Sequence, residues 1–168
     1  MADRHYPIYD TALFSTALAT HVLFSESEGS SSTKQSEDTN MLMGGHFATS
    51  ETFKIERICT FVDDNLAQAD LALVWEQSFM RLMVEQETMI QIPLRMTAYR
   101  EAWSGVLAQT TGADRFLVGL KGDGLTLKVP IVIKGGRQFK VEVVQGTVLN
   151  GTDQRVKVIL DGILSRQA

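Results

Sequence analysis

The amino-acid sequence predicts an all-β protein, a sandwich or barrel of about eight antiparallel strands with one or two short helices. One observation is the alternation of apolar and polar residues near the end of the chain, which is typical of strands with one buried face. Another is the recurrence of turn-forming residues at fairly regular intervals between short apolar runs. Short strands separated in this way favour a sandwich or barrel.

The clearest strands are the last two. Phe139, Val141 and Val143 fall on one face of the first, and the second has an apolar face of the same kind. We expect these two faces to pack against each other inside the fold. Gly135–Gly136 predicts a turn before the first strand, and Asn150–Gly151 predicts one between the two. The apolar face of the second strand comprises Val156, Val158 and Leu160.

The first nineteen residues have no clear strand pattern. They mix polar and apolar types, and Leu13, Phe14 and Leu18 could belong to a short amphipathic helix or to an extended arm that packs on another subunit. We therefore divide the chain into an N-terminal arm or short helix at 1–19 and a β domain at 20–168.

The next segment opens the β domain. Thr20–Ser25 predicts a strand, and Glu26–Lys34 is rich in serine and glycine, a composition that cannot bury a core. We expect an exposed loop there, either mobile or used as a surface projection or subunit contact. Phe53–Val62 predicts a strand whose alternation slips once, so that it has either a bulge near Glu56–Arg57 or two buried faces.

A helix and a hairpin are expected in the middle of the chain. Asp63–Asn65 offers helix N-caps, and the apolar spacing of Leu66–Gln77 predicts a short helix. Phe79–Val84 and Met89–Leu94 predict a hairpin around the polar residues between them. Pro93 places the second of these strands at a sheet edge or at its exit from a sheet.

The segment before the final strands is the most ambiguous. Tyr99–Gly112 fits either a short helix or a loop, Phe116–Leu120 predicts a short strand, and Lys121–Gly124 predicts a turn. Four of the seven methionines also crowd into one short region, where they could fill the core or form an adaptable contact surface. These four are Met80, Met83, Met89 and Met96.

Composition excludes several classes of protein. A length of 168 residues fits one domain, and a net charge of −4 with no run of lysine or arginine argues against a nucleic-acid-binding module. The single cysteine, Cys59, cannot form an internal disulfide and is expected to be a small buried apolar residue. No signal peptide is visible, and no segment reaches the ~20 apolar residues of a membrane span, so we expect synthesis in the cytosol.

The residue types that carry chemistry do not converge in any recognisable pattern. His5, His21 and His46 do not stand at metal-binding spacing to one another or to Cys59, and no Gly-x-Ser-x-Gly elbow occurs. The glycines of Lys121–Gly124 lack the strand–loop–helix context of a phosphate loop. We therefore expect no catalytic residues, no metal and no cofactor, and we do not expect an enzyme.

Two tryptophans leave one alternative open. Trp75 and Trp103 could line a sugar-binding face, but aromatic residues make up 8% of the chain and do not recur at strand spacing, so core packing is favoured. A third possibility, a metal enzyme on a cupin-like barrel, would need histidines and a carboxylate to converge on one ion.

The order of turns and strands resembles that of the small single-jelly-roll capsid proteins of tailless icosahedral viruses with an internal membrane, and of similar proteins in bacteriophage genomes. The likeness covers roughly residues 37 to 166, and it does not extend to Glu26–Lys34 or to the region of Trp103. The stretches that carry it are Glu37–Asn40 with Gly44–Gly45, Phe53–Ile58, Phe79–Leu82, Ile90–Leu94, Val129–Val141 and Val158–Leu164.

The resemblance implies a single jelly-roll β-sandwich over residues 20–168 and a structural role in a virion. The chain would be a capsid building block that self-associates into an icosahedral shell. Its partners would be further copies of itself, a second capsid protein and the internal viral membrane, with no specific nucleic acid. It would be made in the host cytoplasm and located in the capsid. The alternative is a carbohydrate- or receptor-binding jelly-roll module of a phage decoration protein.

Overall fold

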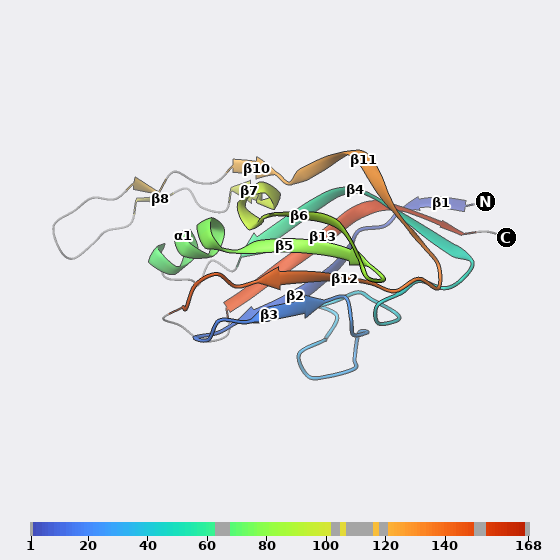
Figure 1. Ribbon diagram of the computed structural model, residues 1–168, viewed down its shortest axis with the longest axis horizontal. Helices are drawn as coiled ribbons and strands as arrows, with labels where there is room; N and C mark the ends of the chain where they lie inside the picture. Colours follow the sequence, from blue (N-terminus) through green and yellow to red (C-terminus); the bar gives the residue numbers. More distant parts are fainter. Residues whose placement is uncertain are drawn as a thin grey trace.

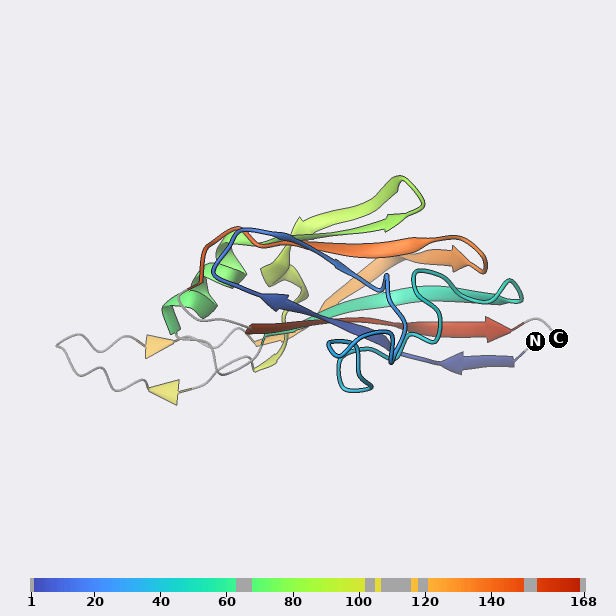
Figure 2. The ribbon, with the colours of Figure 1, turned by 90° about the horizontal axis from the view of Figure 1, so that it is seen from below.

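The fold is a sandwich of two antiparallel β-sheets in a computed structural model (Figures 1 and 2). Both chain termini lie at one end of the sandwich, and the helix α1 lies at the other end (Figure 1). The structure describes residues 2–62, 68–101, 105–106, 116–117, 121–149 and 154–166.

Eight strands form the jelly roll of the two sheets. In chain order they are β2 (Ile8–Phe14), β3 (Thr20–Leu23), β4 (Glu51–Val62), β5 (Phe79–Val84), β6 (Glu87–Pro93), β11 (Leu125–Lys134), β12 (Phe139–Val144) and β13 (Gln154–Arg166). One sheet has the order β2-β13-β4-β11, and the other has the order β3-β12-β5-β6. When these eight strands are numbered 1 to 8 along the chain, the first sheet has the order 1-8-3-6 and the second sheet has the order 2-7-4-5. This is the strand order of a jelly roll, so the predicted fold class is confirmed.

The remaining elements are short. The strand β1 extends the first sheet beyond the end of β2, because it pairs with the last residues of β13. The others lie between the long strands or at the end of the sandwich that carries α1 (Figure 1). The full set of short elements is β1 (Ala2–His5), α1 (Gln68–Gln77), the 3-10 helix η1 (Leu94–Thr97), β7 (Tyr99–Glu101), β8 (Gly105–Val106), β9 (Phe116–Leu117) and β10 (Lys121–Asp123).

The core lies between the two sheets. The inner face of β12 contributes Val141 and Val143, which are both fully buried, and Phe139, which is nearly so. The inner face of β13 contributes its apolar residues from the opposite sheet. These two faces meet in one core, as the alternation predicted. The buried residues of β13 include Val156, Val158 and Leu160.

The predicted bulge is present in β4. Asp161 of β13 pairs with Arg57, but the next residue, Gly162, pairs with Ile55, so Glu56 is the extra residue on β4. The bulge restores the phase of the buried face along this strand. A Cβ at Gly162 would lie 2.0 Å from the carbonyl oxygen of Lys54, so only glycine fits opposite the bulge.

The predicted hairpin and helix are also present. β5 and β6 pair in the antiparallel sense, with Glu85 in a left-handed turn conformation at φ 57°. Pro93 is the last residue of β6, which is an edge strand. The helix α1 begins at Gln68, inside the predicted segment. The expected N-caps at Asp63–Asn65 and the expected turn at Asn150–Gly151 lie outside the described residues.

The expectation of a separate arm or short helix at 1–19 is wrong. Residues 8–14 form β2, the first strand of the jelly roll, and residues 2–5 form β1. The inner face of β2 carries Ile8, Asp10, Ala12 and Phe14, all of them buried. The aspartate interrupts an otherwise apolar alternation, so the sequence of this strand lacks the usual pattern of one apolar face.

The predicted turn at Lys121–Gly124 is also wrong over its first three residues, which form β10 and pair with β7. Gly122 allows the backbone of β10 to approach the backbone at Ala98 closely, because a Cβ at this position would lie 2.2 Å from the Ala98 carbonyl oxygen. The ambiguous region that begins at Tyr99 contains two short strands, β7 and β8, among its described residues. Phe116–Leu117 is a strand, and the rest of the predicted Phe116–Leu120 strand is not described.

Candidate subunit-contact surface

The two lateral edges of the sandwich differ in how they are protected. At one edge, the long loop between β3 and β4 covers the free side of β2. The Tyr9 N–H donates to Asn40 Oδ1 at 2.9 Å, and the Asn40 N–H donates to the Tyr9 carbonyl at 3.3 Å. Further along, the Thr11 hydroxyl donates to the Asp38 carbonyl at 2.9 Å. The loop therefore takes the place of a neighbouring strand, so another chain cannot pair with this part of β2.

A buried ion pair joins the same loop to β2. Lys34 Nζ lies 2.7 Å from Asp10 Oδ1, and the second oxygen of Asp10 accepts the Phe24 N–H. Burial raises the pKa of the Asp10 carboxyl, while the hydrogen bond from Lys34 opposes that rise. The expectation of a loop exposed throughout Glu26–Lys34 is thus wrong at its last residue, since Lys34 is buried.

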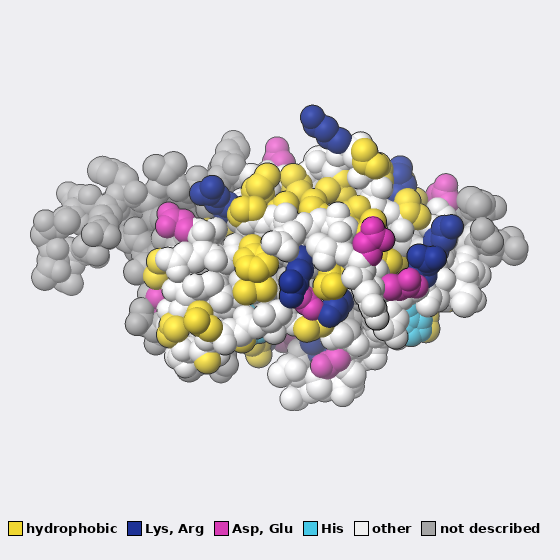
Figure 3. Space-filling view, viewed as in Figure 1, with side chains coloured by type: hydrophobic (Ala, Val, Ile, Leu, Met, Phe, Trp, Pro, Cys, Tyr) yellow, Lys and Arg dark blue, Asp and Glu magenta, His cyan; other side chains and the backbone are white. Residues whose placement is uncertain are grey.

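The opposite edge has no such cover among the described residues. It is formed by β6 and β11, the edge strands of the two sheets on this side. Val129, Val132 and Met89 have 80%, 49% and 42% of their surface exposed. Apolar side chains gather over β6 and β11 in the space-filling view (Figure 3). We call the exposed β6 and β11 surface the open edge.

Two prolines limit backbone hydrogen bonding between the open edge and a strand of another chain. Pro93 in β6 and Pro130 in β11 have no backbone N–H, so neither position can donate to an added strand. Lys128 and Lys134 on β11 are exposed charges of the kind that discourages strand pairing. A partner would therefore bind mainly through the exposed apolar side chains and less through continuation of a sheet.

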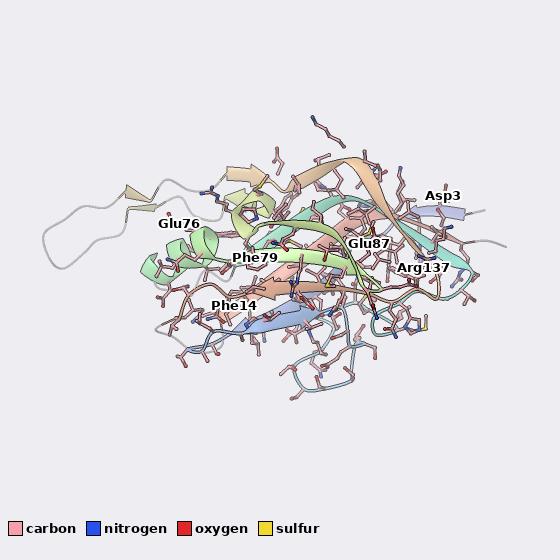
Figure 4. The ribbon with its side chains drawn as sticks, in the orientation of Figure 1. Asp3, Phe14, Glu76, Phe79, Glu87 and Arg137 are labelled. Carbon is pink, nitrogen blue, oxygen red and sulfur yellow. The ribbon has the colours of Figure 1, made fainter. Side chains whose placement is uncertain are left out.

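A groove runs beside the open edge at the tip of the β5–β6 hairpin. Its volume is about 730 Å³, and Val84, Met89 and Val132 are among its apolar lining residues. Glu87 and Arg137 also line it, and both lie near the hairpin tip (Figure 4). The groove therefore combines apolar side chains with charges of both signs, which suits a protein partner.

A second, smaller hollow lies at the end of the sandwich that carries the termini. Its volume is about 200 Å³. One wall comes from the last turns of the β3–β4 loop and the other from β1, β4 and β13. Arg166 donates to Glu51 at 2.9 Å beside it. Its apolar lining includes Ile8, Met41, Phe47 and Leu164, and its polar lining includes Arg4 and His46.

On the outer face of the second sheet, a cluster of charged side chains is paired internally. Glu142 accepts hydrogen bonds from Lys140 at 2.5 Å and from Arg81. The hydrogen bond from Lys140 lowers the pKa of Glu142, burial opposes this, and Arg81 lowers the pKa further. Because every charge in this cluster is paired, it gives no reactive group.

A second charge cluster lies on the outer face of the first sheet. Asp161 accepts from Arg57 Nη2 at 2.6 Å and lies 2.5 Å from His5 Nε2. Burial would raise the pKa of Asp161, but the hydrogen bonds from Arg57 and His5 outweigh it, and the pKa is lowered. Cys59 on the neighbouring strand is buried, which raises the pKa of its thiol to about 11. The expectation that Cys59 is a buried apolar residue is confirmed.

The other residues weighed for chemistry are scattered. His21 stacks on Phe14 with ring centroids 4.7 Å apart, and His46 Nδ1 lies 2.9 Å from the Gly44 carbonyl. Within the described ranges, no three His, Cys, Asp or Glu residues are grouped to hold a metal ion. Trp75 is 3% exposed and packs in the core, so it cannot offer a face to a sugar. Trp103 lies outside the described residues.

The methionine cluster divides between core and surface. Met80 is fully buried, while Met89 and Met96 are exposed. The expectation of core filling is confirmed for Met80, and the alternative of an adaptable contact surface stays a prediction for the two exposed members. The contributions of Val129, Val132 and Arg4 to exposed or hollowed surface have no local signal in the sequence, because strand alternation does not show which strands end a sheet.

Comparisons with known proteins add nothing to this picture. The chain matches no known protein family, no curated protein and no solved structure. Separately, no helix in the described part of the chain has the length and apolar character needed to cross a membrane.

Proposed function

We propose that this chain is a structural virion protein, a single-jelly-roll capsid building block that self-associates into an icosahedral shell. A second capsid protein and the internal viral membrane are its further proposed partners. The observation that carries this proposal is the open edge, where Val129, Val132 and Met89 are exposed with no cover among the described residues, opposite an edge where the β3–β4 loop covers part of β2.

The difference between the two edges favours a particular kind of association. If the open edge of one copy contacts a different surface of the next copy, the contact is heterologous. Heterologous contacts repeat in one direction and generate a ring where the rotation between copies closes, or an open filament where it does not. Exposed apolar surface of this kind on a folded domain marks an interaction site. The jelly roll supplies the rigid block that such an assembly needs.

The electrostatics are compatible with a shell protein that contacts other proteins. The net charge of −4 provides no positive field to gather a genome. The charge clusters on the two outer sheet faces pair internally, around Glu142 in one sheet and around Asp161 in the other. Contacts between subunits would therefore fall mainly on the edges and ends of the sandwich.

The test is whether the purified chain associates through the open edge. We expect sedimentation velocity to show concentration-dependent oligomers of the wild-type chain, and Val132→Lys to weaken them. Val148→Lys is the matched control, because Val148 is exposed to a similar extent, 53% against 49%, but lies in the β12–β13 connection. A wild-type chain that stays monomeric at all concentrations and is absent from virus particles would overturn the proposal.

A further inference from the structure

The small hollow beside β1 has the size of one side chain. Its volume is about 200 Å³, and its lining includes the buried residues Ile8, Met41, Phe47 and Leu164. Apolar cavities of about 150 Å³ hold a molecule the size of benzene, whereas pockets for drug-sized ligands are about 300–1,000 Å³. The hollow therefore suits a single apolar side chain of a partner better than a metabolite.

The charge at this hollow points to a partner with a nearby carboxylate. Arg166 is paired with Glu51. Arg4 is exposed, its guanidinium lies 4.6 Å from the centre of the Tyr6 ring, and it forms no ion pair with any other described residue. The hollow therefore presents an apolar interior and one available positive charge.

The β5–β6 hairpin of the same chain has the complementary chemistry. Leu82 pairs with Ile90 and Met83 pairs with Thr88, so Met89 is an extra, bulged residue, and it is 42% exposed. A bulge directs a side chain away from the regular face of its strand. Glu87, two residues earlier, forms no ion pair within the described ranges and lies near the hairpin tip (Figure 4).

The placement of the two features excludes a contact within one molecule. The tip of the β5–β6 hairpin and β1 lie at the same end of the sandwich but on opposite sides of it (Figure 2). Copies standing side by side with their long axes roughly parallel would bring the hairpin of one to the hollow of the next. Such a contact joins unlike surfaces and repeats in one direction.

We infer that the hollow beside β1 binds the β5–β6 hairpin of a second copy of this chain, with Met89 in the hollow and Glu87 facing Arg4. Methionine suits this role because its flexible side chain adapts to an irregular cavity. The inference rests on the proposed function, since it requires self-association, and it names the two surfaces that meet.

Charge reversal tests the pairing. Arg4→Glu and Glu87→Arg are each expected to weaken association of the full-length chain about tenfold or more at low salt, because like charges then face each other. An equimolar mixture of the two variants should regain association, since each copy then finds a neighbour of opposite charge. Sedimentation velocity on the separate variants and on the mixture measures this.

The apolar contact is tested separately. Met89→Asp should abolish association, and Met96→Asp is the matched control, because Met96 is also exposed, at 51%, but lies on η1. Circular dichroism and thermal melting establish that each variant is folded before association is compared.

The outcomes separate this inference from the proposal on which it rests. If the wild-type chain associates and the charge and Met89 variants associate equally well, the hairpin does not occupy the hollow, but the proposed function stands. The same conclusion follows if each charge variant fails to associate and an equimolar mixture of the two does not regain association. If the wild-type chain never associates, the proposed function fails, and this inference fails with it.

Discussion

The ammonium group of Lys34 lies 2.7 Å from Asp10 Oδ1, and 3.0 Å from the carbonyl oxygen of Thr11, in a site almost closed to water. The carboxylate of Asp10 is fully buried on the inner face of β2. Transferring both charges from water costs several kcal/mol each, and only their mutual attraction and hydrogen bonds offset this. The pair therefore adds a buried contact between residues far apart in the sequence to the hydrogen bonds that hold the β3–β4 loop against β2.

The first prediction concerns the loss of this contact. Lys34→Met should lower the free energy of unfolding by about 3–5 kcal/mol, because it leaves the Asp10 carboxylate buried without its partner. Urea unfolding followed by tryptophan fluorescence measures the change. The loss should shrink in acid, where Asp10 can take up a proton and become neutral.

Lys54→Met is the control for that substitution. Lys54 also pairs with a carboxylate, that of Glu56 at 2.8 Å, but both side chains are 44% exposed. Exposed pairs contribute less than about 1 kcal/mol. Equal losses at the two positions would show that the Asp10–Lys34 pair is no more important to the fold than a surface pair.

The second prediction concerns acid stability. The hydrogen bond from Lys140 lowers the pKa of Glu142 in the folded protein. The unfolded chain, in which a glutamate has a pKa of about 4.3, therefore binds this proton at higher pH than the folded protein does. The stabilisation by Glu142 is complete above that value and is lost as the pH falls through the lowered, folded-state pKa.

Glu142→Gln should consequently flatten the fall in the free energy of unfolding below about pH 5. Unfolding curves in urea at a series of pH values measure the slope. Glu76→Gln, on the exposed surface of α1, is the control and should retain the wild-type slope. A Glu142→Gln variant with the wild-type slope would mean that Glu142 is not a source of the acid sensitivity.

The third prediction concerns the thiol. Cys59 is 3% exposed, and burial raises its pKa to about 11, so only about one thiol in ten thousand is ionised at pH 7. We expect negligible reaction of the folded protein with Ellman's reagent and rapid release of one equivalent after denaturation in urea. Rapid reaction of the folded protein would contradict the burial of this side chain.

Local alternation was sufficient to predict several elements because it records which face of a strand is buried. Val141 and Val143 on β12 and the bulge at Glu56 could be predicted in this way. The hairpin of β5 and β6 could be predicted as well, since both strands and the turn between them lie within one short stretch of sequence.

Features that depend on distant residues could not be predicted in this way. Asp10 interrupts the alternation of β2, and its partner Lys34 lies 24 positions further along the chain. Likewise, nothing near Val132 shows that β11 ends its sheet, because strand order is decided by pairing across the whole fold. The open edge and the hollow beside β1 are therefore properties of the assembled sandwich and have no local sequence signal.

The fourth prediction tests the packing of the two closing strands. Val141 is fully buried on β12, where it belongs to the core shared with the inner face of β13. Val141→Asp would place an unpaired charge there and should destabilise the fold by about 4 kcal/mol or more, enough to unfold many domains of this size. Val148→Asp, at a position that is 53% exposed, should change the free energy of unfolding by less than about 0.5 kcal/mol. Thermal melting of both variants beside the wild-type chain measures the difference. A Val141→Asp variant that melts with the wild-type chain would mean that this face of β12 does not form the core.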